Sequence, residues 1–175
     1  MLVEGGSITI DAGGDGIKST NDNDPFLGYI TVTGGDIDIT SASDGMQAET
    51  SVLLESGNIS INAGAKGVRA NISILGTGAE VTVESVGGGL SSDDIIEITD
   101  GQFDITADAN GITADTLLLI SGGTINVIES EEGLKSGTIQ IEGGDITLNS
   151  LGDAVQAEID LDISGGNIDI ATGEG

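Results

Sequence analysis

Aliphatic residues recur along the chain in short alternating pairs. Pairs at positions i and i+2, such as Ile8/Ile10 and Ile37/Ile39, place both side chains on one face of an extended strand, and the segments are too short to predict helices. The pattern repeats with a marker, the second residue of a Gly-Gly-like pair, at Gly6, Gly35, Gly57, Ala79, Gly101, Gly123, Gly144 and Gly166. Successive markers lie 22 residues apart, except for a first spacing of 29 and a sixth spacing of 21. This repeat indicates a solenoid.

Each period contains three aliphatic columns, which predict three strands. The first column contains Ile8/Ile10, Ile37/Ile39, Ile59/Ile61, Val81/Val83, Phe103/Ile105, Ile125/Val127, Ile146/Leu148 and Ile168/Ile170. The second contains Ile17, Met46, Val68, Leu90, Ile112, Leu134 and Val155. The third contains Ile30/Val32, Val52/Leu54, Ile72/Ile74, Ile96/Ile98, Leu117/Leu119, Ile139/Ile141 and Leu161/Ile163. We expect all three columns to face the inside of a coil.

These columns predict an all-β, single-domain, right-handed parallel β-helix with three short strands per coil of about 22 residues and seven to eight coils. Stacking the coils at about 4.8 Å lets each strand pair in parallel with its equivalent one period later. The domain covers residues 1–175, with an inserted acidic loop at 21–27. The chain begins on a third strand and stops after a first strand, so both ends are expected to be uncapped. They belong either to a segment of a longer protein or to subunits that stack end to end.

The charge of the chain narrows the possible partners. With 30 acidic and 4 basic residues the formal net charge is -26, and the sequence has no Cys and no His. Disulfides, thiolate or imidazole metal sites and a Ser-His-Asp triad are therefore excluded. So acidic a chain repels nucleic acid and anionic membrane surfaces, and no apolar run is long enough to span a membrane. Cations are the expected partners, and we expect neither nucleic-acid binding nor membrane insertion.

Acidic residues gather at the corner before the second strand and just after it. The inserted loop adds Asn21, Asp22, Asn23 and Asp24, and such oxygen-rich segments are typical calcium ligands. The candidate calcium ligands are Asp15, Asp22, Asp24, Asp44, Glu49, Asp93 and Asp115. The alternative, that the acids only keep the rod solvated, is preferred for the acids that alternate outward along the strands: Asp36, Asp38, Asp104, Asp145, Asp162 and Asp169.

A line of basic and amide side chains follows the second strand. Lys18, Gln47, Arg69 and Lys135 fall at equivalent positions and should project from one face. Beside bound calcium they could contact the carboxylates and hydroxyls of an acidic polysaccharide. The alternative, that the basic residues neutralise neighbouring acids, stays open.

The corner motif D-G-I-K-S at 15–19, the following N-D-N-D-P at 21–25 and the related D-G-M-Q-A-E at 44–49 resemble one family. It is the family of extracellular bacterial and archaeal right-handed β-helix proteins called carbohydrate-binding domain-containing, whose architecture is similar to that of pectate lyases. The resemblance implies a calcium-binding, non-catalytic protein outside the cell or at its surface that binds acidic sugars such as polygalacturonate, or cellulose. It also implies calcium ligation by Asp15, Asp22, Asp24 and Asp44, whereas Lys66, Gly88 and Ala154 depart from the family pattern.

Three functions remain open from the sequence. The first is a calcium-dependent binding module for acidic polysaccharide. The second is a structural subunit that stacks end to end into a calcium-stabilised extracellular filament. The third is a calcium-dependent lyase with Lys66, Arg69 or Lys18 as the base. A strongly negative field raises the pKa of such a base, so we expect no enzyme activity.

Overall fold

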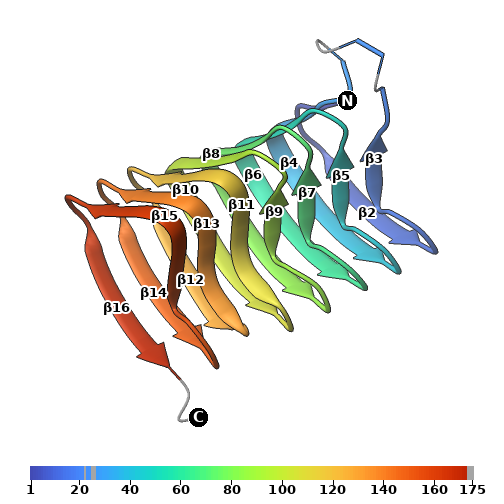
Figure 1. Cartoon of the computed structure of the whole chain (residues 1–175). Coiled ribbons are helices and arrows are strands. Elements are labelled where there is room, and N and C mark those ends of the chain that lie inside the picture. The colour runs from blue at the N-terminus through green and yellow to red at the C-terminus, as the bar shows by residue number, and fades with distance from the viewer. Residues whose placement is uncertain (22, 25–26, 173–175) are drawn as a thin grey trace.

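The computed structural model describes residues 1–21, 23–24 and 27–172. These residues form sixteen strands and no helix, and all strand pairs are parallel and belong to one sheet network that winds around the molecule. Figure 1 shows the coils stacked along one axis, with the N-terminal strands (blue) and the C-terminal strands (red) at opposite ends. The prediction of an all-β solenoid with parallel strands is confirmed. The right-handed sense and the number of seven to eight coils stay predictions.

The strands divide each coil differently in the two halves of the chain. In the N-terminal half the second strands are separate: β3 (Ile17–Ser19), β5 (Met46–Ala48), β7 (Val68–Ala70) and β9 (Leu90–Ser92). There each third strand continues into the next first strand: β4 (Ile30–Ser41), β6 (Ser51–Ala63), β8 (Ser73–Ser85) and β10 (Ile95–Ala107). Later the second and third strands are continuous: β11 (Asn110–Ile120), β13 (Glu132–Ile141) and β15 (Val155–Ile163). The remaining strands are β1 (Leu2–Val3), β2 (Ser7–Ala12), β12 (Thr124–Glu129), β14 (Asp145–Ser150) and β16 (Asn167–Thr172).

The joining of strands around a corner differs from the three separate short strands that we expected. The marker glycines have a positive φ both at corners where the strand continues, as at Gly57, and at corners where it ends, as at Gly123. Gly57 has φ 105°, and a Cβ added there would lie 2.7 Å from the carbonyl oxygen of Gly35 in the preceding coil. At the equivalent Ala79 the positive φ moves to the preceding Gly78.

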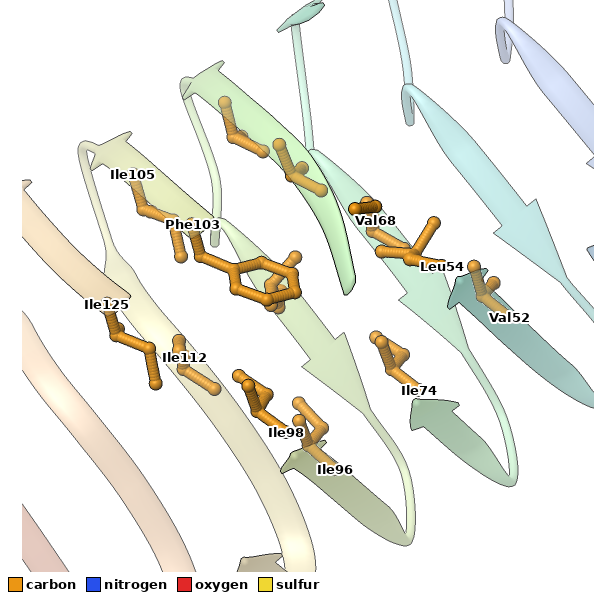
Figure 2. Close-up of a cluster of buried hydrophobic side chains, with 14 of the residues drawn as sticks. Val52, Leu54, Val68, Ile74, Ile96, Ile98, Phe103, Ile105, Ile112 and Ile125 are labelled. Atoms are coloured by element: carbon orange, nitrogen blue, oxygen red, sulfur yellow. The ribbon is translucent and has the colours of Figure 1, made fainter. Parts of the chain in front are cut away.

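The aliphatic columns fill the inside of the coil as ladders, as Figure 2 shows for residues from Val52 to Ile125. The first column is confirmed, since Ile37 pairs with Ile59 and Val81 with Phe103. The second column is also confirmed by its register.

Two assignments in the third column were wrong. Ile74 faces inward and is fully buried, whereas Ile72 is 45% exposed. In the same way Leu118 and Ile120 are buried, while the predicted Leu117/Leu119 pair lies on the outer side of β11.

A large and a small residue compensate each other in the core. Phe103 is fully buried in a column otherwise made of Ile and Val. Its ring extends to Gly76 on β8, where a Cβ would lie 2.5 Å from the ring atom Cζ. The missing side chain at Gly76 therefore makes room for the one ring in this part of the core.

No helix among the described residues is long and apolar enough to cross a membrane.

Candidate functional site

One outer face of the solenoid carries the basic and amide candidates. We call it the short-strand face; it is formed by β3, β5, β7 and β9 and by the first residues of β11, β13 and β15. Parallel register places successive side chains of one column on neighbouring coils, about 4.8 Å apart. The basic column of this face is Lys18, Gln47, Arg69, Ser91, Thr113, Lys135 and Gln156. The structure thus aligns the four predicted sugar-binding residues, although their role stays a prediction.

Each basic side chain of the protein already has a polar partner. Lys18 Nζ lies 2.7 Å from Asp15 Oδ2, and Lys135 Nζ lies 2.9 Å from Glu132 Oε2. Arg69 Nη2 lies 3.6 Å from a carboxylate oxygen of Asp93.

The fourth basic residue, Lys66, donates from Nζ to the Ser91 hydroxyl at 2.8 Å. The arrangement agrees with the second reading of the basic residues, neutralisation of adjacent acids. Three of the four basic side chains thus face carboxylates, while Lys66 faces a hydroxyl and Arg69 Nε has no hydrogen-bond partner within the described part of the chain.

Two of these pairs shift the pKa of a partner. The pKa of Asp15 is lowered from 3.8, first by the hydrogen bond from Lys18, against a smaller opposing effect of burial, and also by the backbone N–H of Asp44. The pKa of Lys135 is raised from 10.5, mainly by its hydrogen bond to Glu132. Acidic neighbours thus hold Lys135 in its charged form, which is the opposite of what a general base needs.

The corner acids connect one coil to the next. Asp15 Oδ1 accepts a hydrogen bond from the backbone N–H of Asp44 at 3.2 Å, and Asp44 Oδ1 accepts one from the backbone N–H of Lys66 at 3.0 Å. Each carboxylate satisfies a corner N–H of the following coil. These two predicted calcium ligands therefore have a structural task that the sequence did not reveal.

The acids beyond the second strand are arranged along a second line. Glu49 Oε1 accepts a hydrogen bond from Asn71 Nδ2 at 2.8 Å, Asp93 faces Arg69, and Asp115 is exposed. Among residues 1–21, 23–24 and 27–172, no group of three or more acidic side chains lies close enough together to hold a metal ion. Asp15, Asp44, Glu49, Asp93 and Asp115 thus follow the second strands without forming a cage, and Asp24 lies in the inserted loop.

The inserted loop is anchored by backbone and side-chain hydrogen bonds. Asn21 Oδ1 accepts from the backbone N–H groups of Asn23 at 3.2 Å and Asp24 at 3.1 Å. Thr50 holds the other end of the loop, donating from Oγ1 to the carbonyl of Leu27 at 2.9 Å. Asp22, also a predicted ligand, lies outside the described residues.

Sequence reasoning missed a groove on a different face. It has a volume of about 410 Å³ and crosses β2, β4, β6 and β8, where outward polar side chains line it. Asp36 and Asn58 belong to this lining and share a hydrogen bond of 2.9 Å between successive coils. The sequence did show that these residues point outward, but it did not show that the face is hollowed.

Comparison with known proteins adds the family. A family model described as carbohydrate-binding domain-containing protein matches residues 1–70 and 68–175, which together span the chain. No curated protein and no solved structure gives a significant match. A parallel β-solenoid with polar outer faces agrees with such a function, because extended faces can accommodate extended chains. The chain therefore belongs to the carbohydrate-binding domain-containing protein family.

Proposed function

We propose that this protein is a non-catalytic, extracellular or cell-surface binding protein for acidic polysaccharide, with calcium ions joining protein carboxylates to those of the sugar. The family supports binding of carbohydrate without catalysis. The observation that carries the finer proposal is the pairing of every basic side chain with a protein partner. A uronate chain near this face meets mainly carboxylates, so a divalent cation has to compensate the repulsion.

The described acids fit a shared calcium site better than a closed one. Calcium takes six to eight oxygen ligands, and no three acidic side chains of the described residues come together. Asp93 and Asp115 are exposed on the short-strand face and would supply protein ligands, with the remaining ligands coming from the sugar. Bound calcium supplies a positive charge that attracts the uronate carboxylates.

Titration calorimetry with an oligogalacturonate tests the proposal. We expect heat of binding in calcium and none after addition of a chelator. Heat of equal size with the chelator would contradict the bridging role of calcium. No heat of binding under either condition would contradict acidic polysaccharide as the ligand.

Lyase activity is not proposed. Of the three possible bases, Lys18 and Arg69 face carboxylates, and Lys66 donates to Ser91. A base has to reach the proton that it removes, and these side chains are directed toward protein partners instead. We expect no unsaturated product when the protein is incubated with polygalacturonate and calcium, and its formation, measured by ultraviolet absorbance, would overturn this assignment.

End-to-end stacking is a second candidate function. Leu161 and Ile163 on β15 are 45% and 50% exposed, whereas the equivalent Ile139 and Ile141 on β13 are fully buried. A further coil stacked on this apolar surface, whether from the same polypeptide or from a second copy, would cover it. Sedimentation velocity in calcium and in chelator tests this candidate, because a strict monomer in both would exclude it.

A further inference from the structure

The outer side of the third strands differs from the other faces of the solenoid because it is almost uncharged. The parallel register aligns its outward side chains in two columns. The first column is Leu2, Thr31, Leu53, Leu75, Glu97 and Leu119. The second column is Ser51, Ser73, Ile95 and Leu117. We call these ten residues of β1, β4, β6, β8, β10 and β11 the apolar face.

Acidic residues are concentrated away from the apolar face. Glu97 is the one charged residue among its ten members, and no charged residue lines the hollow of about 370 Å³ at its N-terminal end. The groove side of β4, β8 and β10, by contrast, presents Asp36, Asp38, Glu80 and Asp104. Two copies with a net charge of -26 each repel one another over most of their surfaces. Through the apolar face they can approach without opposing rows of carboxylates.

The apolar face offers little to a ligand that depends on hydrogen bonds. Ser73 donates from Oγ to Ser51 Oγ at 2.9 Å, so these two hydroxyls pair with each other along their column. Leu53 and Leu75 are partly exposed beside them and have no hydrogen-bonding groups. A surface of this composition gains mainly from the exclusion of water by another apolar surface.

The relief of the face fits a second copy of itself. On β6 the large Leu53 stands beside the small Ser51, and on β8 Leu75 stands beside Ser73. A two-fold axis parallel to the solenoid axis would place each column of one copy over the other column of its partner. The leucines of each copy would then pack over the serines of the other, which is the reciprocal contact of an isologous dimer.

The size of the face favours a second copy over a single chain. Six strands at about 4.8 Å, with segments of about five residues at about 3.3 Å each, give about 500 Å² per copy. Two copies would cover about 1,000 Å² in total, which is the lower limit for a specific interface and predicts a weak dimer. A single polysaccharide chain is one ring wide and would leave part of the face uncovered.

We propose that two copies of this protein associate through their apolar faces, with neither calcium nor sugar required. Because the contact is isologous, association stops at the dimer, whereas end-to-end stacking would continue into longer assemblies. The short-strand face and the groove on β2, β4, β6 and β8 stay uncovered. The dimer therefore goes beyond the function proposed above and does not depend on it.

Sedimentation equilibrium in chelator, from micromolar to millimolar protein, tests the dimer. We expect a monomer–dimer equilibrium without larger species. Sodium chloride should strengthen the association, because salt screens the repulsion between the two acidic copies. A monomer at every protein and salt concentration, or assemblies that grow beyond the dimer, would overturn the proposal.

A double variant, Leu53→Thr with Leu75→Thr, removes two leucines from each apolar face. Thr31 already occupies this column and threonine is favoured in strands, so the fold is preserved. We expect the dimer to weaken at least about tenfold. Leu151→Thr makes the same exchange at a leucine that is 67% exposed at the corner after β14, and it should change the dissociation constant less than about twofold. Equal losses in both proteins would show unspecific hydrophobic attraction and would overturn the interface.

The acid of the face gives a test in the opposite direction. The proposed axis brings Glu97 of the two copies to the same level, so Glu97→Gln should tighten the dimer a few-fold. The fold should tolerate this change because Gln140 occupies the equivalent position on β13. Unchanged or weaker association would contradict the proposed arrangement.

Two further outcomes would assign the observations to another partner. Leu161→Thr alters the C-terminal end of the stack and should leave the dimer unchanged, so a loss of association would assign the contact to stacked ends. A monomeric protein whose leucine variants lose retention on an insoluble neutral polysaccharide would assign the apolar face to sugar. Either result would overturn the dimer. The same preparations titrated with oligogalacturonate and calcium report separately on the proposed function.

Discussion

The Asp15 carboxylate is shared by two partners at the corner of its coil. One oxygen accepts from Lys18 and the other from the backbone of Asp44, and the side chain is 14% exposed. A carboxyl group whose pKa is lower in the folded than in the unfolded state stabilises the fold above its unfolded pKa. That contribution is lost as the pH falls through the lowered folded value.

Asp15→Asn should therefore lower the free energy of unfolding at neutral pH by about 1 kcal/mol. The difference from the unmodified protein should shrink as the pH falls below 3.8, the ordinary pKa of this group. Urea unfolding at neutral pH and near pH 3 measures it, with Asp169→Asn as the charge control. A difference that stays constant with pH would argue against the ion pair with Lys18.

For single residues, the sequence predicted the face on which a side chain lies better than it predicted the group that the side chain contacts. Equivalent positions in a 22-residue repeat must share a face, so the alignment of Lys18 with Gln47 could be deduced. The choice of partner depends on side-chain geometry across a corner. Lys18 and Lys135 each reach back three residues to an acid, and nothing in the sequence favours that contact over contact with a ligand.

At the scale of a strand, the ladders depend on size as well as polarity. Phe103 and Gly76 lie on β10 and β8 and act as a complementary pair. Their equivalents on the next coil are Ile125 and Ile98. The pair can therefore be exchanged for the residues that the rest of each column uses.

Gly76→Ile should destabilise the protein by about 2 kcal/mol or more, because the new side chain overlaps the ring of Phe103. Phe103→Ile alone should also destabilise it, by leaving a cavity. The double variant should recover most of the loss, to within about 1 kcal/mol of the unmodified protein. Chemical denaturation of all four proteins gives the coupling energy, and strictly additive effects would contradict the pairing.

The corner glycines allow a second test on the same strands. Gly57→Ala places a Cβ on a residue with φ 105° and close to the Gly35 carbonyl, so we expect a loss of about 2 kcal/mol. Ala79→Gly, at the equivalent corner, should cost less than about 1 kcal/mol. Thermal unfolding distinguishes the two, and similar effects would show that the corner conformation is not what requires glycine.

The errors in the third column arise where the alternation of apolar and polar residues does not show which positions face inward. Residues 117–120 are four aliphatic residues in a row, so either alternate pair could face inward. After Ile74 the next inward position is Gly76. An aliphatic residue there would have shown that Ile74, and not Ile72, belongs to the inward pair.

At the scale of the whole molecule, a net charge of -26 opposes the compact state. Only 4 Lys and Arg residues stand against 30 Asp and Glu residues, so little of this charge is compensated within the chain. Cations should therefore stabilise the fold, and a divalent ion that binds specifically should do so beyond simple screening.

We expect calcium to raise the melting temperature more than sodium chloride of equal ionic strength. At a calcium concentration about 100 times the dissociation constant, the added stability is about 2.7 kcal/mol for one site. Differential scanning calorimetry with calcium, sodium and a chelator measures it. Equal shifts in calcium and sodium would mean that screening accounts for the whole effect.

The Phe103–Gly76 pair also bears on how the chain finds one alignment with itself. In a chain of similar repeats, a slip by one whole period would exchange aliphatic residues for aliphatic residues and leave most pairings intact. Phe103 does not tolerate this exchange, because Leu54, the equivalent residue on β6, would then stand where Gly76 makes room for the ring. A residue that interrupts the repeat can thus favour the correct alignment of the coils during folding, while the regular positions supply stability.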